Sequence, residues 1–442
     1  MDVIEEILTP VKIPRFVKIR QIFDKKKITK KELPLRINNE IHKEGMLDRV
    51  KANQKVGITA GSRGIANIAL IIKEIVRNIR EVRAQPYIIP CMGSHGGARA
   101  KGQRQILNKL GITEEYLKAP ILSSMDVVKI GKTVSHVDVY VDKNAVKMDA
   151  LIVVNRIKPH TAFRAEVESG IQKIIAVGLG KQKGAEACHA LGFGKMHRNI
   201  TEITDVVLNK LNIAFAIGII ENAYDETFEC IALRTKEIKD TEPVLLEIAK
   251  NHRPQIMFKD LDVLIVDEMG KNISGGGMDT NIIGRYATPY ISGGPNISKI
   301  AVLDLTKESK GNATGVGHAD FITQRLKNKI KLEETYPNAL TSTVTGPVKI
   351  PMILSNDLLA IKAGIMTCNC DYKKGIRIVR IRNTLKIEEI WISEALIDLA
   401  KANKYIEIIS NLQDMYFDNE GNLFNLKKPP SLKAVMVYYR KH

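Results

Sequence analysis

At 442 residues and 49.3 kDa, the chain is too long for one ordinary hydrophobic core, so two or three domains are expected. A hydrophobic fraction of 44% with charges of both signs is typical of globular proteins. No apolar run approaches the roughly 18 residues of a membrane span, and acidic residues stand near the N-terminus where a signal peptide has basic ones. The five cysteines are scattered and odd in number, which favours reduced thiols. We therefore expect a cytoplasmic protein without a membrane partner.

The charge balance indicates an anionic partner. Lysine and arginine number 67 against 49 aspartates and glutamates, a formal net charge of +18. Such an excess suits phosphates and other anions. The dense basic runs are short, as at residues 25–27, and no aromatic residues that could stack bases are interleaved with them. Nucleic acid is therefore not favoured, and small anionic molecules are.

Two strand–loop–helix units follow a lead-in over residues 1–50 that is interrupted by prolines. The first has a strand at 55–59, the loop GSRG at 61–64 and a helix over 65–83 with apolar residues at helical spacing. The second has a strand at 87–91, the loop GSHGG at 93–97 and a helix over 100–110. The carboxyl ends of parallel strands share one edge of a sheet, so Arg63 and His95 should lie at the same edge. Helix N-termini at that edge favour anions.

Each of these two side chains also has a purely structural interpretation. Arg63 could satisfy a loop carbonyl, and before other evidence this is as plausible as a functional role. The glycines on both sides of His95 indicate a close approach of its backbone to another group, which favours function there.

The stretch 150–197 concentrates the residues that could carry chemistry. An alternating segment at 137–141 predicts an antiparallel strand, and an apolar strand at 151–154 leads into a loop with His160. His160 alone could be a capping or core histidine. Glu166 and Glu168 could be metal ligands, acid/base groups or partners of nearby arginines such as Arg164, and the last interpretation is favoured for at least one of them.

Further along this stretch a lysine stands alone in an apolar segment. Lys173 either extends its ammonium to solvent, the usual case, or is buried for chemistry. The glycine-rich, basic segment 178–184 suits a phosphate-bearing group. Cys188 and His189 follow side by side, and because adjacent helical side chains diverge, only one of them is expected to bind a metal.

The remaining chain predicts a second α/β domain beginning near residue 255. Strands are predicted at 213–220, 261–266, 299–305, 340–344 and 377–381, and helices at 242–250, 320–329 and 393–404. Lys271, Asn281 and Arg285 lie in or after the loop that follows strand 261–266 and could reach a site between the domains. The fold class is therefore α/β, with two domains of parallel-rich sheets flanking a central cleft. Residues 1–255 form the catalytic domain, and residues 256–442 close the cleft, the last helix packing on the first domain.

Five motifs in order resemble the nickel-pincer lactate racemase family. They are GSRG (61–64), GSHGG (93–97), KPHTAF (158–163), Lys173 and His189, which follows Lys173 by sixteen positions. The resemblance extends over roughly the first 290 residues and is strongest from 55 to 190. Each motif alone is weak, whereas five in the same order are specific.

The resemblance implies a cofactor and a role for each residue. A pyridinium-derived mononucleotide that carries nickel would be tethered through a thioamide to Lys173, with His189 as the protein ligand of the nickel. His95 and His160 would be the catalytic acid and base, and Arg63 would bind the substrate carboxylate. Further residues predicted at the site are Ser62, Gly96 and Gly97 for the cofactor, and Lys271, Asn281 and Arg285 for the substrate.

The chemistry of a 2-hydroxy acid is consistent with these roles. Its α C–H is a poor acid, so removal of a hydride while a base takes the hydroxyl proton gives a planar 2-keto acid, and return of the hydride to the other face inverts the centre. This requires a hydride acceptor that side chains cannot supply. It also requires a histidine on each side of the plane and a guanidinium to hold the carboxylate. The expected activity is therefore that of a 2-hydroxyacid racemase or C2-epimerase, an isomerase.

The segment 161–172 departs from the lactate-specific pattern. It is longer, and it carries two glutamates and Arg164. The loop SGGGMDTN at 274–281 departs too. Both changes imply a larger or more polar 2-hydroxy acid, such as a sugar acid epimerised at C2.

Two other functions and several partners follow from the same residues. A non-catalytic homologue that binds metal or nucleotide would not need both His95 and His160, and a metal hydrolase with histidine ligands would not need Lys173. The expected partners are an anionic 2-hydroxy acid and the enzymes that mature the cofactor, and a homo-oligomer is also considered.

Overall fold

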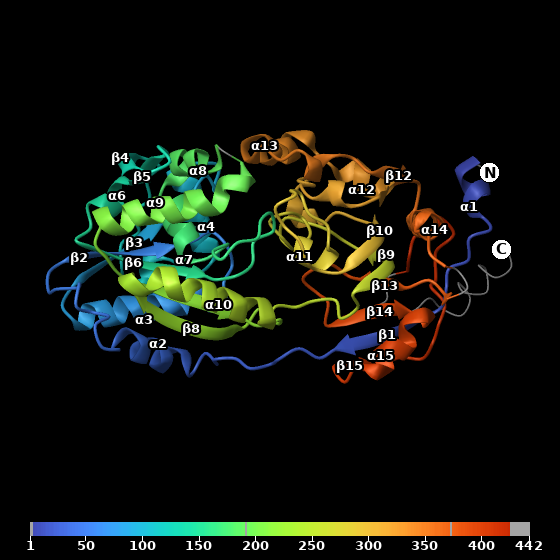
Figure 1. Ribbon diagram of the computed structural model, residues 1–442, viewed down its shortest axis with the longest axis horizontal. Coiled ribbons are helices and arrows are strands. Elements are labelled where there is room, and N and C mark those ends of the chain that lie inside the picture. Colours follow the sequence, from blue (N-terminus) through green and yellow to red (C-terminus); the bar gives the residue numbers. More distant parts are fainter. Residues whose placement is uncertain (1–2, 191, 372–373, 425–442) are drawn as a thin grey trace. The chain divides into compact units, whose positions relative to one another are not determined.

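The computed structural model describes residues 3–190, 192–371 and 374–424, and the chain forms two compact units (Figure 1). Residues 24–253 make up the first, here called the N-terminal unit. The segment up to Phe23 joins the chain from Pro254 onward in the second, the C-terminal unit. The sequence placed all of residues 1–255 in one domain, so the structure assigns the first 23 residues differently.

A five-stranded sheet forms the centre of the N-terminal unit, in the order β3-β2-β6-β7-β8. The first four strands run parallel and β8 is antiparallel to β7. Their bounds are β2 Lys55–Ala60, β3 Gln85–Pro90, β6 Ala150–Arg156, β7 Ile213–Glu221 and β8 Thr227–Arg234. A separate antiparallel hairpin consists of β4 Val127–Lys132 and β5 Asp138–Asp142.

Helices cover both faces of this sheet, because its strands are apolar on both sides. One core packs α2 (Leu33–Ile41) and α3 (Ile68–Glu81) on the sheet. The other core packs the opposite face against α7 (Ile171–Lys173), a π-helix (Ile174–Gly178), α8 (Lys181–His189), α9 (Met196–Lys210) and α10 (Ile238–His252) (Figure 1). Shorter elements are α4 Ala100–Lys109, α5 Glu114–Leu117 and α6 Lys143–Val146, with 3-10 turns at Phe193–Lys195 and Thr235–Glu237.

An eight-stranded mixed sheet forms the C-terminal unit, in the order β12-β11-β10-β9-β13-β14-β1-β15. Strands β12 to β13 in that order are parallel, and β14, β1 and β15 are antiparallel. The bounds are β1 Phe16–Gln21, β9 Asp260–Val266, β10 Asn296–Val302, β11 Phe321–Thr323, β12 Met352–Leu354, β13 Ile378–Ile381, β14 Glu389–Ser393 and β15 Ile406–Ile408. The helices are α1 Val3–Leu8, α11 Thr280–Ile283, α12 Gln324–Lys329, α13 Leu332–Ser342, α14 Asp357–Thr367 and α15 Ile397–Ala402, with 3-10 turns at Lys307–Ser309, Val316–His318, Gly346–Val348 and Glu394–Leu396.

The α/β class with parallel-rich sheets is confirmed, and most predicted elements are present. The strand predicted at 340–344 is wrong, because these residues form the end of α13 and the turn after it, where Thr343 takes a left-handed φ of 60°. The helix predicted at 320–329 is in fact the short strand β11 followed by α12. Within the described ranges, no helix combines the length and apolar character needed to cross a bilayer. The central cleft stays a prediction.

Candidate functional site

Three neighbouring strands bring the predicted site loops to one edge of the N-terminal sheet. In the order β3-β2-β6, the chain leaves each strand at its carboxyl end into the loop that carries His95, Arg63 and His160, respectively. The strands are parallel, with Ala60 level with Pro90, so these loops share one edge as the sequence predicted. Two of the loops touch directly, since Ser62 Oγ lies 2.5 Å from His95 Nδ1.

Gly96, next to His95, is explained by packing. Gly96 has φ +75°, and a Cβ there would lie 2.6 Å from the backbone nitrogen of Gln103 in α4. A Cβ on Gly102 would in turn collide with the carbonyl of Gly96. The loop therefore lies directly on α4, and this close approach alone requires glycine at position 96. The cofactor roles of Gly96, Gly97 and Ser62 stay predictions.

The loop of His160 is organised by a buried carboxylate. Glu168 accepts a hydrogen bond from the His160 backbone N–H at 2.6 Å and from the guanidinium of Arg164 at 3.2 Å. Its other oxygen lies 3.2 Å from the ammonium of Lys250. Glu168 is thus an arginine partner that shapes the loop, as favoured from the sequence, whereas Glu166 is exposed.

The ring of His160 is held neutral in this environment. Burial, followed by the positive charges of Lys173 and Lys158, lowers the pKa of His160 well below its ordinary value. The backbone N–H of Ala162 donates to Nδ1 at 3.0 Å, so the neutral ring carries its proton on Nε2. His160 therefore offers a hydrogen-bond donor at Nε2 in this arrangement.

Lys173 lies where α7 passes into the π-helix, a rare geometry that is frequent at functional sites. Burial is the largest cause that lowers the pKa of Lys173 to about 8, and the charges of Lys158 and Arg63 add to it. The start of α7 is capped by the buried carboxylate of Glu242, which accepts from the Gln172 backbone N–H at 3.0 Å. Near neutral pH, a much larger fraction of the Lys173 amine than of an ordinary lysine is therefore uncharged and hence nucleophilic.

The backbone contact of His189 leaves its Nε2 able to act as a metal ligand. Its Nδ1 lies 2.6 Å from the carbonyl of Ala185, one turn earlier in α8, and because a carbonyl only accepts, Nδ1 carries the proton. The lone pair therefore stays on Nε2, and burial keeps the ring neutral by lowering its pKa.

The neighbouring Cys188 does not share that role. Its thiol is fully buried against Met196, with 3.6 Å between the two sulfurs, and burial raises its pKa to about 12. His189 is thus the ligand-competent member of the pair.

Two phenylalanines pack on the histidines, and the sequence reasoning assigned neither of them a role, although Phe163 lies in the motif KPHTAF. The ring of Phe193 lies 6.1 Å from that of His160 and 5.9 Å from that of His189, measured between centroids. Phe163 packs on His160 at 4.6 Å. Phe193 follows His189 in the chain within a Gly-Phe-Gly run, and nothing in that local pattern distinguishes it from a turn residue.

Positive charge is concentrated around Lys173. The pKa of Arg63 is lowered by surrounding protein and by the nearby charge of Arg156, although Arg63 is exposed to solvent. Arg156 is paired with Glu221, which also accepts from the backbone N–H of Ala66 and so ties the Arg63 loop to β7. No ion pair of Arg63 or Lys173 is found among the described residues. An anion bound here would relieve this repulsion.

The two lysines of the basic segment 178–184 differ in their surroundings. The segment 178–184 was expected to suit a phosphate, but Lys181 is fully buried, with its ammonium 3.0 Å from the carboxylate of Asp142. It also donates to Gln103 Oε1 at 2.9 Å and to the carbonyl of Pro90. The charge of Lys181 is therefore paired with that of Asp142 inside the N-terminal unit, whereas Lys183 is exposed.

The three residues of the C-terminal unit that were predicted to bind substrate form hydrogen bonds or ion pairs within that unit. Lys271 donates to the carbonyl of Gly275 at 2.7 Å, and the side chain of Asn281 donates to Asp279 at 3.0 Å. Arg285 forms a 2.6 Å ion pair with Asp320 and donates to the carbonyl of Ser298. Their substrate roles stay predictions.

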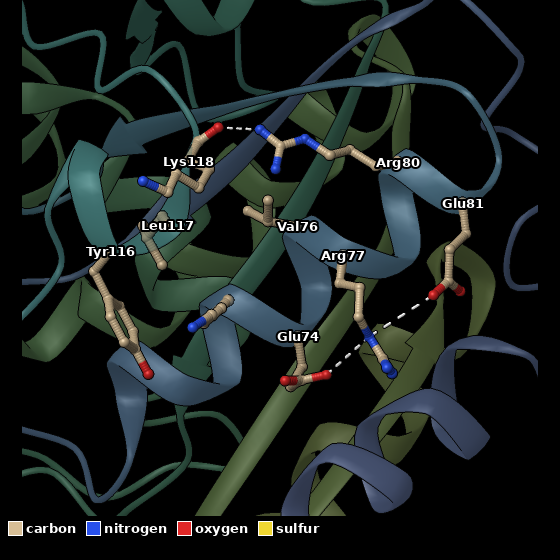
Figure 2. Close-up of a pocket in the computed structure, with 9 residues that line it drawn as sticks. Glu74, Val76, Arg77, Arg80, Glu81, Tyr116, Leu117 and Lys118 are labelled. Carbon is tan, nitrogen blue, oxygen red and sulfur yellow. Dashed lines mark hydrogen bonds and ion pairs between the residues drawn. The ribbon is translucent and has the colours of Figure 1, made fainter.

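A pocket of about 400 Å³ lies away from these residues, along the outer side of α3 and α5 (Figure 2). Its charged side chains are used by their neighbours: Arg77 pairs with Glu74 and Glu81, and Arg80 donates to the carbonyl of Lys118. None of the predicted site residues lines it. In the described part of the chain, no cluster of three or more potential metal-ligating side chains is found.

Comparison with known proteins gives a match to one family. Residues 10–201 match the family model of the lactate racemase N-terminal domain, a segment that contains all five motifs. No curated protein matches in sequence. Among solved structures, the lactate racemase apoprotein from Thermoanaerobacterium thermosaccharolyticum is 14% identical, with 89% of this chain and 96% of that chain covered and a TM-score of 0.48. A protein from Thermotoga maritima is 12% identical, with 73% and 82% covered and a TM-score of 0.49.

The match to the family model, rather than these distant structural likenesses, carries the comparison. It supports a racemase or epimerase activity in the broad sense. Over residues 10–201, the chain is therefore similar to the lactate racemase N-terminal domain.

Proposed function

We propose that the protein is a 2-hydroxyacid racemase or C2-epimerase that works with a nickel-pincer nucleotide tethered to Lys173. The observation that carries the proposal is the state of two side chains on one helical segment. Lys173 has a pKa of about 8, and His189 has its Nε2 lone pair available because Nδ1 donates to Ala185. A nucleophilic amine and a neutral imidazole are the two groups that a covalently attached metal cofactor requires.

The residues present are suited to such a group. The amine of Lys173 would supply the covalent attachment and His189 Nε2 a nickel ligand. The positive charges of Arg63 and Lys158 suit an anionic cofactor or substrate. When bound, the nucleotide supplies the hydride acceptor that side chains lack.

The chain's own residues would bind the substrate and move its hydroxyl proton. Arg63 binds the carboxylate and fixes the axis about which the reacting carbon changes face. His95 exchanges a proton at Nε2, because the hydroxyl of Ser62 can donate to Nδ1 or accept from it and so follows either state of the ring. For His160 to accept a proton at Nε2, the ring must give up the hydrogen bond from Ala162. Of the two histidines, His95 can therefore take up and release a proton at Nε2 with less rearrangement of its hydrogen bonds.

The tether is tested by mass spectrometry of protein produced together with the cofactor-maturation enzymes and nickel. We expect an adduct on the peptide that contains Lys173, absent from protein produced without those enzymes. Lys173→Arg should abolish the adduct, and Lys183→Arg, on the exposed side of α8, should keep it. An active enzyme with unmodified Lys173 would refute the tether.

The substrate is expected to be larger or more polar than lactate, because the His160 loop contains the Arg164–Glu168 pair within its longer segment. A panel of chiral 2-hydroxy acids would identify it, through loss of optical rotation for an acid with one stereocentre and through a change of rotation for a sugar acid. A non-catalytic metal- or nucleotide-binding homologue would show the adduct but no turnover with any acid. A hydrolase with histidine ligands would be active without the adduct.

A further inference from the structure

We propose that Gln103 and Lys181 are positioning residues that hold the His95 loop in register with the helical segment that carries Lys173 and His189. The proposal rests on the proposed function only for its catalytic consequence. Both side chains are fully buried, so each acts through the loop rather than on the substrate.

The hydrogen bonds and ion pair of these residues form a continuous buried network. Gln103 in α4 donates through Nε2 to the carbonyl of Gly93 at 2.9 Å and to that of His95 at 3.3 Å. Its Oε1 accepts from the ammonium of Lys181 at 2.9 Å. That ammonium lies 3.0 Å from the carboxylate of Asp142, whose other oxygen caps α6 by accepting from two backbone N–H groups. Gln103, Lys181 and Asp142 are all 0% exposed.

The location of Lys181 shows which segments these contacts connect. Lys181 begins α8, eight residues after Lys173 and eight before His189, on one nearly continuous helical run. Its ammonium also donates to the carbonyl of Pro90, the last residue of β3, from which the His95 loop departs. One side chain therefore connects the start of the His95 loop, through Pro90, and its middle, through Gln103, to the segment with the proposed tether and ligand.

A buried ion pair is a costly way to stabilise a core, since apolar residues of similar size often do as well. What it adds is a defined geometry, because the three N–H groups of a buried ammonium must each find an acceptor, and this fixes the groups around it. Here the ammonium holds the amide of Gln103, whose Nε2 donates to two carbonyls of a loop that is also pressed against α4 at Gly96. The arrangement restrains the backbone of His95 while its ring stays exposed.

The test removes the hydrogen bonds from Gln103 to the His95 loop and keeps the ion pair of Lys181 with Asp142. Gln103→Met has a similar volume but cannot donate to the Gly93 and His95 carbonyls, and it leaves Lys181 and Asp142 together. Gln105→Met is the matched control, because Gln105 is exposed on the same helix. Gln103→Glu is a second variant, which still accepts from Lys181 but, when ionised, cannot donate to the loop.

The first readout uses the apo protein, so it does not depend on turnover. The rate at which diethyl pyrocarbonate modifies His95 is followed by peptide mass spectrometry, alongside thermal unfolding. We expect a severalfold change of this rate in both Gln103 variants and none in Gln105→Met. Identical rates in all three variants and the parent would overturn the proposal, whatever the protein catalyses.

The second readout uses loaded enzyme. Gln103→Met should keep the Lys173 adduct, the nickel content and KM, while kcat falls on the order of 10- to 100-fold, the cost of a misplaced acid/base group. Gln103→Glu should recover little of the lost kcat, because its ionised side chain cannot donate to the loop either. A fall of kcat that is matched by an equal loss of adduct would assign Gln103 to cofactor loading or folding and would also overturn the positioning role.

Discussion

The acidity of Lys173 gives the sharpest prediction for the apo protein. A pKa of about 8 in place of 10.5 leaves about 9% of the amine neutral at pH 7, against about 0.03% for an ordinary lysine, a difference of about 300-fold. The reactive fraction should therefore rise steeply up to pH 8 and level off above it.

Competitive labelling with acetic anhydride across pH 6–11 measures this fraction. Peptide mass spectrometry would report labelling of Lys173, with the exposed Lys183 as the reference for reagent reactivity. We expect a midpoint near pH 8 for Lys173. Because burial is the main cause and Arg63 a smaller one, Arg63→Met should raise the midpoint only part of the way to 10.5. Arg77→Met, an exposed change on α3, should leave it in place.

A Lys173 midpoint of about 10 or higher in the parent protein would refute the reasoning, since burial and two nearby charges could not then be acting on the amine. An unchanged midpoint in Arg63→Met would refute the part assigned to Arg63 alone.

Three other changes test the surrounding groups. His189→Ala should lose nickel yet keep the Lys173 adduct, whereas Cys188→Ala should keep both; metal analysis of the purified proteins decides, and equal nickel in the two would reject His189 as the ligand. Glu168→Gln should weaken the His160 loop and cost about 1–3 kcal/mol in urea unfolding, because it leaves Arg164 and Lys250 with a neutral partner; an unchanged midpoint would show that the carboxylate charge is not needed. Burial raises the pKa of Glu242 to about 7, so the folded form binds a proton that the unfolded form has lost above about pH 4.5. The free energy of unfolding should thus fall as pH rises from about 4.5 to 7, by up to about 3 kcal/mol, and Glu242→Gln should remove that slope in thermal unfolding measured against pH; the same slope in the variant would assign it elsewhere.

Local patterns alone predicted much of the N-terminal unit. Apolar residues at helical spacing and glycine loops after apolar strands located β2, α3, β3 and α4. Because parallel strands share their carboxyl edge, the sequence also brought Arg63 and His95 together. Such features depend on neighbours within a few residues, so they are readable without a structure.

Other features depend on residues far apart in the chain, and only the tertiary structure decided them. Phe16–Gln21 became a strand of the C-terminal sheet because its partners lie at 389–393 and 406–408. The sequence does not show that Lys181, within the basic segment 178–184, has its ammonium enclosed by Asp142 and Gln103. The proton on His189 Nδ1, and with it the lone pair on Nε2, follows from one carbonyl at 2.6 Å. Residue types and order can thus name the chemical groups of a site, but the tautomer, charge and orientation of each group are set by the atoms that folding places around it.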